Sequence, residues 1–248
     1  MPRSVRLAAW GTAVLRGESG VSAAVAAVTR DDEPHDVGGL AEASDLATLL
    51  TWLPGRSTSM RVALPVPGDV GALPGPSSFN LEALDSGECA LADPGVGMVP
   101  VVTEFGSEWE PGAMVTWHVH EVSSRRTSEW GSLGEAERAL AQALREATEV
   151  LATLDVARWR DDAATRILSV RDGALPRDVL PPSSDPRAVR VLGTAARVRA
   201  IVALAAEDDG AAISGWEAHR RAEALIGLDG VARRAMAAAV DASLAPAR

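Results

Sequence analysis

The spacing of apolar residues changes near residue 131, and this change limits the folds open to the chain. Before it, as in 115–119 (VTWHV), apolar residues alternate with polar ones, which is the two-residue period of a half-buried strand. Along 133–154 they recur every third or fourth position, which is the period of a helix. We therefore expect an α+β fold, with a small, mostly antiparallel sheet and N-terminal helices in 1–131. A C-terminal helical bundle follows in 132–248, and we expect the two parts to pack as one globular unit.

The first part predicts both helices and strands. Helical spacing predicts helices at 5–16, 21–30 and 44–53, and a short helix at 80–85. Alternating apolar residues predict strands near 60–66, 88–92, 98–105 and 113–122. We expect the helices on one side of this sheet, and we interpret the acidic run DDEPHD at 31–36 as a solvated turn.

The second part predicts helices almost throughout. Ser132 and Glu135 have the spacing of a capping box, in which a hydroxyl accepts from an early amide and a carboxylate reaches back, and Ser214 and Glu217 repeat it. The expected helices cover 133–154, 161–172, 185–209, 215–226 and 230–243. The first of them carries an unbroken apolar seam: Leu133, Ala136, Leu140, Ala143, Ala147, Val150 and Leu154.

Composition and charge exclude several functions. The net charge of the 248 residues is −10, and residues 1–131 hold 8 arginines against 17 acidic residues. An acidic surface repels the phosphate backbone that supplies most non-specific DNA affinity. No apolar run approaches the ~18 residues that span a bilayer. The single cysteine, Cys89, can form neither an internal disulfide nor a multi-cysteine zinc site. We therefore expect a cytoplasmic protein without a membrane span or a cofactor.

The segment 64–76, LPVPGDVGALPGP, allows two interpretations. Its prolines fix the backbone and cannot donate hydrogen bonds, which favours a stiff, ordered corner at a strand end, with the Asp69 carboxylate accepting from nearby amides and Ser77 or Ser78 capping the next helix. Loops on rigid scaffolds also carry binding sites, and here the polar groups of a binding rim would come from Asp69, Ser77, Ser78 and Asn80.

Several stretches resemble a family of hypothetical proteins from high-GC Gram-positive (actinobacterial) bacteria. They are LPVPGD, LPGPSSFN, EALDSGE and the helical run RAVRVLGTAARVRAIVALAAEDDG, and the likeness covers most of the chain. The resemblance implies no activity, cofactor or catalytic residue.

The pair His118 and His120 in WHVHE is the sharpest candidate for chemistry. On a strand the two imidazoles share one face, about 6–7 Å apart, and neutral imidazoles can share one metal ion. The preceding Pro-Gly pair makes the stretch resemble the first half of the cupin metal motif. That motif implies a glutamate four or five positions after the second histidine, where Ser124 and Arg125 stand, and Glu121 points to the opposite face. We expect no catalytic metal, and a cupin-like metal-dependent enzyme stays an alternative.

Arginines on the last helices offer a second alternative. Arg187, Arg190 and Arg197 lie on nearly one helix face, and IGLDG joins two predicted short helices as in a helix-turn-helix DNA-binding regulator. Neighbouring acidic residues can pair with these arginines, so we expect no measurable binding of duplex DNA at physiological salt.

The sequence also lacks the motifs of common enzyme classes. The sequence has no nucleophile elbow and no phosphate-binding glycine pattern. We therefore expect a non-enzymatic module that binds a protein partner or self-associates into a homo-oligomer.

Overall fold

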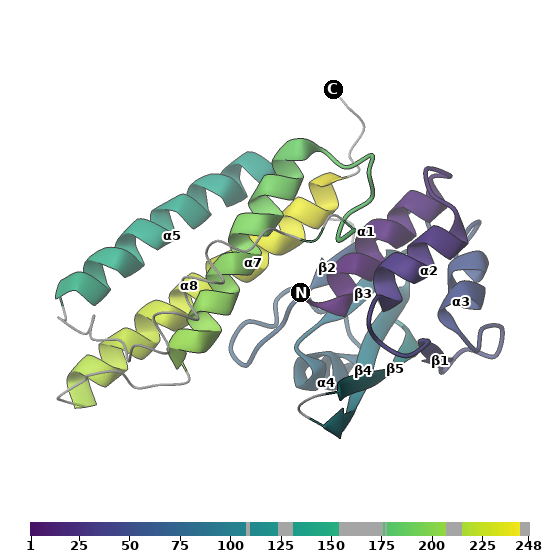
Figure 1. Cartoon of the computed structure of the whole chain (residues 1–248), viewed down its shortest axis with the longest axis horizontal. Helices are drawn as coiled ribbons and strands as arrows, with labels where there is room; N and C mark the ends of the chain where they lie inside the picture. Colours follow the sequence, from purple (N-terminus) through teal and green to yellow (C-terminus); the bar gives the residue numbers. More distant parts are fainter. Residues whose placement is uncertain (108–109, 124–130, 154–175, 177, 207–214, 244–248) are drawn as a thin grey trace. The chain divides into compact units, whose positions relative to one another are not determined.

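The computed structural model describes residues 1–107, 110–123, 131–153, 176, 178–206 and 215–243 (Figure 1). Contacts between residues divide the chain into two compact units. Unit 1 comprises Met1–Glu129, Arg177–Asp185 and Val240–Arg248, and unit 2 comprises Trp130–Pro176 and Pro186–Ala239. The expectation that two parts, 1–131 and 132–248, pack as one globular unit stays a prediction.

Unit 1 is built on a sheet whose strand order, among the described residues, is β1-β5-β4-β3-β2. The strands are β1 (Asp36–Gly38), β2 (Ser59–Ala63), β3 (Cys89–Asp93), β4 (Val96–Ser107) and β5 (Glu110–Glu121). β1 pairs with β5 in parallel, and the other neighbours pair antiparallel. The α+β class and the small, mostly antiparallel sheet are therefore confirmed.

The helices of unit 1 lie close to their expected positions. They are α1 (Arg3–Leu15), α2 (Val21–Thr29), α3 (Leu46–Trp52) and α4 (Ser77–Ser86). Asp45 starts α3 through a capping box with Thr48, because its side chain accepts from the Thr48 amide at 2.8 Å.

The interpretation of 31–36 as a solvated turn is only partly right, because the chain turns at exposed Asp31 and Glu33 is exposed as well, but the turn does not extend to residue 36. Asp36 begins strand β1, and His35 is only 2% exposed. A strand of three residues is too short to show an alternating pattern, so apolar spacing could not predict it.

The sheet carries helices on both faces, not on one as expected. A Cβ built on Gly11 would lie 2.2 Å from the Met60 sulfur, so α1 approaches β2 over a glycine. Ala63, three residues further along β2, packs in a core cluster with Phe79 and Ala83 of α4. Residues three apart on a strand point to opposite faces. We call the two sides the α1 face and the α4 face.

Helix α4 lies close to β4 because β4 has a glycine beneath it. A Cβ on Gly97 would stand 2.5 Å from the ring of Phe79, which is fully buried. The helix begins at Ser77 with Pro76 at the N-cap and no capping side chain, so the expectation that Ser77 or Ser78 caps it is wrong.

The segment 64–76 is held by backbone hydrogen bonds. Val66 and Asp69 exchange two of them, at 2.9 and 3.4 Å, and the Asn80 side chain accepts from the Gly75 amide at 2.9 Å. The expected strand to residue 66 is too long, since β2 ends at Ala63. That the Asp69 carboxylate accepts from nearby amides stays a prediction.

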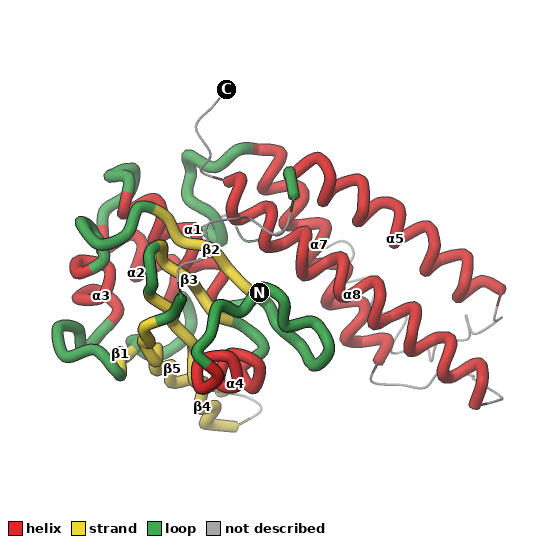
Figure 2. Tube along the Cα trace, turned by 180° about the vertical axis from the view of Figure 1, so that it is seen from behind, coloured by secondary structure: helices red, strands yellow, loops and turns green. Residues whose placement is uncertain are grey.

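Unit 2 contains α5 (Leu133–Thr153) and α7 (Pro186–Ala206), together with most of α8 (Gly215–Ser243) (Figure 2). The capping box that opens α5 is confirmed, because the Ser132 amide donates to Glu135 at 2.7 Å and the Ser132 hydroxyl accepts from the Glu135 amide at 3.3 Å. Three residues of the predicted seam of α5, Ala136, Leu140 and Ala147, are buried, whereas Leu154 and the side chain of Val150 lie outside the described residues. The predicted helix at 161–172 and the Ser214 cap lie outside the described residues.

The last predicted break in the chain is absent. Helix α8 runs without interruption through IGLDG, where two helices were expected. Gly227 and Gly230 lie inside this helix, and the buried side chains of Leu228 and Ala232 hold it. The turn of a helix-turn-helix is therefore not present at this place. No helix in the described residues has the length and apolarity that crossing a membrane requires.

Candidate functional site

Two histidines of β5 meet one carboxylate of α4. His118 and His120 lie two residues apart and so share the α4 face of the sheet. One oxygen of Glu82 contacts Nδ1 of His118, and the other lies 2.7 Å from Nε2 of His120. We call Glu82, His118 and His120 the histidine cluster.

The histidine cluster is open to solvent on one side. The side chains of His118, His120 and Glu82 are 43%, 25% and 27% exposed. The Phe79 ring meets the His120 ring edge-on at 5.5 Å. Although His120 Nε2 is close to Glu82, it has no hydrogen bond with good angles to any described residue, so this contact is an ion-pair approach only.

The cluster works as a clamp between α4 and β5. No group of three or more histidine, cysteine, aspartate or glutamate side chains in the described residues could hold a metal ion. Here both carboxylate oxygens already contact ring nitrogens. Sequence reasoning missed Glu82, although its spacing of three from Phe79 places it on the helix face that meets the sheet.

An uncovered apolar strip continues the same face away from the cluster. Val101, Phe105 and Met114 are 38%, 45% and 51% exposed. Register places them together, because Thr103 pairs with Met114 and Val101 with Thr116. We call Val101, Thr103, Phe105 and Met114 the open strip. Its residues on β4 lie beyond Met98, where the pairing with β3 ends. Figures 1 and 2 show the β4–β5 hairpin to which they belong.

The outer edge of β4 beside this strip has no strand partner among the described residues. β3 pairs with β4 only as far as Met98, and the Ser86 hydroxyl donates to the Pro100 carbonyl at 2.9 Å. Even-numbered residues of β4 therefore direct their backbone groups outward. Val102, Glu104 and Gly106 follow with no backbone partner in the described part of the chain. We call Val102–Gly106 the free edge.

The other edges of the sheet each have a hydrogen-bonding partner from a neighbouring helix or loop. On β2, the Met60 amide donates to the Thr12 hydroxyl at 2.9 Å. On β1, the Val37 amide donates to the Ser44 carbonyl at 3.0 Å. Beyond β1, the Glu33 amide donates to the Ala113 carbonyl of β5 at 2.9 Å. Natural sheets usually protect their edges, so an uncovered edge marks a place for pairing.

The α1 face holds a buried polar network instead. The Trp117 indole donates to Nδ1 of His35 at 3.1 Å, and Nε2 of His35 lies 3.1 Å from Asp32. Arg3 binds the same carboxylate with two hydrogen bonds of 2.7 Å. Burial lowers the pKa of His35 and outweighs the Asp32 carboxylate, which favours the charged form. A neutral imidazole fits both contacts, since it accepts at Nδ1 and donates at Nε2.

Asp32 and Arg3 stay charged within this network. Burial alone would raise the pKa of Asp32, but hydrogen bonds from Arg3 and His35 lower it below its ordinary value. The hydrogen bond with Asp32 raises the pKa of Arg3.

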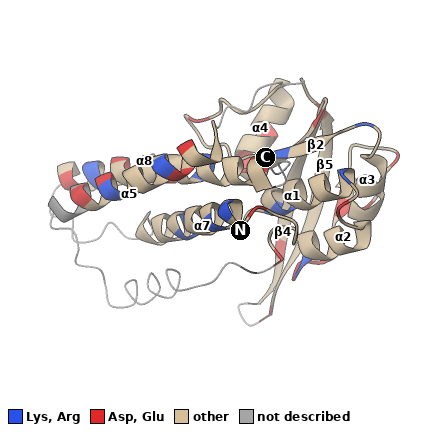
Figure 3. Ribbon diagram, turned by 90° about the horizontal axis from the view of Figure 1, so that it is seen from above, with Lys and Arg blue, Asp and Glu red and all other residues tan. Residues whose placement is uncertain are grey.

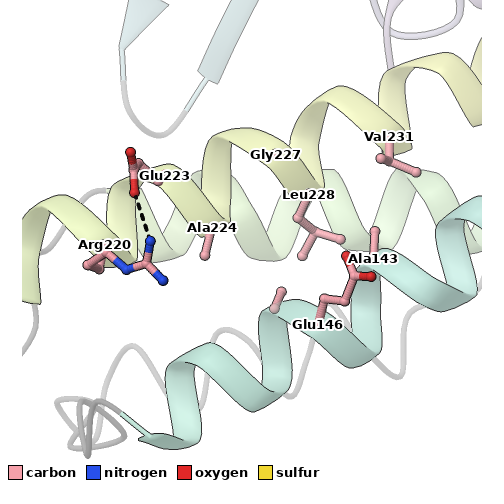
Figure 4. A pocket seen from close by; sticks show the side chains of 9 residues that line it. Ala143, Glu146, Arg220, Glu223, Ala224, Gly227, Leu228 and Val231 are labelled. Atoms are coloured by element: carbon pink, nitrogen blue, oxygen red, sulfur yellow. Dashed lines mark ion pairs between the residues drawn. The ribbon is translucent and has the colours of Figure 1, made fainter.

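Two cavities lie apart from the histidine cluster. One of about 410 Å³ lies between α5 and α8 of unit 2, lined mainly by small and apolar residues, with an Arg220–Glu223 ion pair of 3.5 Å at its rim (Figure 4). The other, about 450 Å³, lies beside the tip of the β4–β5 hairpin and carries Asp31, Asp32 and Glu104. In the second cavity the Ser107 hydroxyl accepts from the Glu110 amide at 3.3 Å and makes no hydrogen bond to a carboxylate of the described residues, so it is not activated as a nucleophile.

The arginines singled out for nucleic acid are largely engaged or dispersed. Arg187 pairs with Glu137 at 2.6 Å, and Arg197 approaches Thr194 at 3.5 Å. Arg190 is exposed. Acidic and basic residues are interspersed along α8, so this helix carries both signs of charge, as the red and blue segments of the ribbon show (Figure 3). With the turn of the predicted motif absent, DNA binding is not favoured.

The loop residues and the cysteine supply no reactive group. Ser77 and Ser78 are exposed, and Asn80 is engaged in the turn at Gly75. Cys89 is buried in β3, and burial raises the pKa of its thiol to about 12. A thiol with that pKa is not a nucleophile at neutral pH.

Comparison with known proteins places this fold in a family. The model of the N-terminal domain of Rv1486c-like proteins matches residues 4–130, and the model of their C-terminal domain matches residues 134–237. The chain belongs to the Rv1486c-like family. The resemblance to an actinobacterial family of hypothetical proteins is thereby confirmed.

Relatives in mycobacteria share most of the chain. The uncharacterized protein Rv1486c of Mycobacterium tuberculosis is 34% identical in an alignment 232 positions long, and the alignment covers 85% of this chain and 78% of the relative. The uncharacterized protein ML1804 of Mycobacterium leprae is 28% identical in an alignment 203 positions long, which covers 68% of this chain and 65% of the relative. These names state no activity, and no solved structure matches the chain. The function of the family is not known.

Proposed function

We propose that this Rv1486c-like protein is a non-enzymatic, cytoplasmic interaction module that binds protein through the β4–β5 hairpin. The observation that carries the proposal is the free edge beside the open strip. Outward backbone groups supply hydrogen bonds to an added strand, and exposed Val101, Phe105 and Met114 supply apolar contact.

The rest of the described structure supports binding rather than catalysis. In the histidine cluster, Glu82 contacts both His118 and His120 and so joins α4 to the sheet. The single thiol is buried. The cupin-like metal enzyme and the DNA-binding regulator are less well supported, because the histidine pair contacts a carboxylate and the arginine helix has no turn at IGLDG.

A photo-crosslinking amino acid at position 105 tests the proposal. We expect protein adducts in an extract of the source organism or in a concentrated solution of the protein, and their loss when Glu104→Pro removes an outward amide from the free edge. The same crosslinker at Val70, which is 46% exposed on the 64–76 segment, is the matched control. Equal crosslinking at both positions would show that the hairpin has no special affinity for protein.

A further inference from the structure

We propose that the occupant of the free edge is the β4 strand of a second copy of this chain, paired antiparallel around a two-fold axis at Thr103. This inference rests on the proposed function and names its partner. A two-fold axis brings the same surface of both copies together, so the edge must be complementary to itself.

The backbone of the free edge fits such pairing. Val102 and Glu104 direct both their amide and their carbonyl groups outward. Around an axis at Thr103, Val102 of one copy faces Glu104 of the other, and each of these two symmetric pairs exchanges two hydrogen bonds. Pro100, which has no amide hydrogen, limits the pairing on one side.

Charge selects this register. Glu104 is the one charged residue between Val96 and Ser107, in a chain whose net charge is −10. An axis at Glu104 would set two carboxylates directly opposite each other, which is destabilising. An axis at Thr103 sets each carboxylate opposite Val102 instead. A foreign acidic strand would meet repulsion along the same edge, whereas a second copy brings a mostly uncharged one.

The side chains of the open strip fit the same axis. On the α4 face, Val101 of one copy lies opposite Phe105 of the other, and the two Thr103 side chains lie opposite each other. Apolar pairs of aromatic and β-branched residues stabilise neighbouring antiparallel strands. The pairing would thus join the two open strips into one continuous apolar surface and cover the free edges of both copies.

A cysteine at the axis tests the register directly. Opposite residues of a non-hydrogen-bonded antiparallel pair have Cα atoms about 4.5 Å apart, within the range that a disulfide bridges. We expect Thr103→Cys to form a disulfide-linked dimer on a non-reducing gel. Val101→Cys is the matched control on the same strip, because it faces Phe105 of the second copy and should stay unlinked; the native Cys89 is buried in both variants.

Light scattering after size exclusion tests the dimer itself. We expect a dimer at tens of micromolar, about tenfold or more weakened by Glu104→Pro, which removes two of the four edge hydrogen bonds. Glu104→Thr, which keeps the amide, should remain dimeric.

Each possible result decides between the two proposals. A wild-type monomer without the Thr103→Cys disulfide, or a dimer that Glu104→Pro leaves intact, overturns the second copy as occupant. Crosslinking from position 105 to a different protein, lost in Glu104→Pro, would then keep the interaction module and replace its partner. If the protein forms no dimer and position 105 crosslinks to no protein, both the second copy as occupant and the interaction module are wrong.

Discussion

Strand β5 presents two neighbouring residues to opposite environments. Trp117 points into the α1 face, where it is fully buried and bound to His35. His118 points to the α4 face, where its side chain is 43% exposed and bound to Glu82. Among the described residues, the α1 face is covered by α1 and by the loop that carries Asp32 and His35. The α4 face is covered by α4 and by Leu73 of the 64–76 segment, and it is exposed at the open strip. The two faces of one strand therefore differ in burial: the residues around Trp117 are enclosed, whereas part of the α4 face is exposed to solvent.

The largest expected difference between the faces is in packing. Trp117→Ala should lower the free energy of unfolding by about 3–5 kcal/mol, because it leaves a cavity and removes the hydrogen-bond donor to His35. Met114→Ala on the open strip should stay within about 0.5 kcal/mol of wild type, since its side chain is half exposed. Urea denaturation followed by circular dichroism measures both. Similar losses at the two positions would mean that the open strip is part of the core.

Isosteric changes of the two carboxylates sharpen the comparison. Asp32→Asn weakens hydrogen bonds from Arg3 and His35 in a mostly buried site and should cost about 1.5–3 kcal/mol. Glu82→Gln weakens contacts that solvent screens and should cost about 0–1 kcal/mol. The same denaturation measurement applies. If Glu82→Gln lowers the free energy of unfolding as much as Asp32→Asn does, the histidine cluster contributes as much stability as the buried polar network on the α1 face.

His35, which is buried on the α1 face, should also make the stability of the protein depend on pH. The pKa of His35 is lowered in the folded state, whereas in the unfolded chain it has its ordinary value of about 6.5. Below that pH the unfolded chain therefore binds more protons than the folded protein. The free energy of unfolding should therefore fall as the pH drops below about 6.5, and the loss should level off below the folded-state pKa. One such group contributes at most about 1.4 kcal/mol per pH unit.

A matched pair of variants separates His35 from the other histidines. His35→Gln should remove this part of the slope, whereas His219→Gln, at an exposed position on α8, should keep it. The measurement is the free energy of unfolding between pH 7 and pH 5 in small steps. An unchanged slope in His35→Gln would mean that its burial does not govern its protonation.

Features with a local period could be read from the sequence. The seam of α5 and the Ser132–Glu135 cap depend on residues three or four apart, and the long strands β4 and β5 show alternation. These patterns are fixed by backbone geometry alone. They gave the fold class and most helix and strand positions.

Features that depend on distant neighbours could not be read. Glu82 meets His118 only after the chain has folded, so the cluster shows no sequence spacing. The free edge depends on the fact that no other described strand pairs with Val102–Gly106, and no pattern within these residues can show that. The glycines at 227 and 230 indicate a break, since each costs about 1 kcal/mol relative to alanine in a helix, yet burial of neighbouring residues offsets that cost.

The smallest expected effect is metal binding at the histidine cluster on the α4 face. In the structure both oxygens of Glu82 contact ring nitrogens of His118 and His120, so the donors are turned toward one another. A catalytic zinc needs three protein ligands spaced around the ion and an open position. Protein purified without a histidine tag should therefore contain less than one equivalent of zinc, iron, manganese and nickel together.

His219→Ala serves as the control, because it removes an exposed histidine that pairs with Glu223 outside the cluster. One equivalent of a metal that His219→Ala keeps, but that His118→Ala, His120→Ala and Glu82→Gln each lose, would replace the clamp with a metal site. The two faces of β5 would then differ in chemistry as well as in burial, and the enzyme alternative would rank above the interaction module.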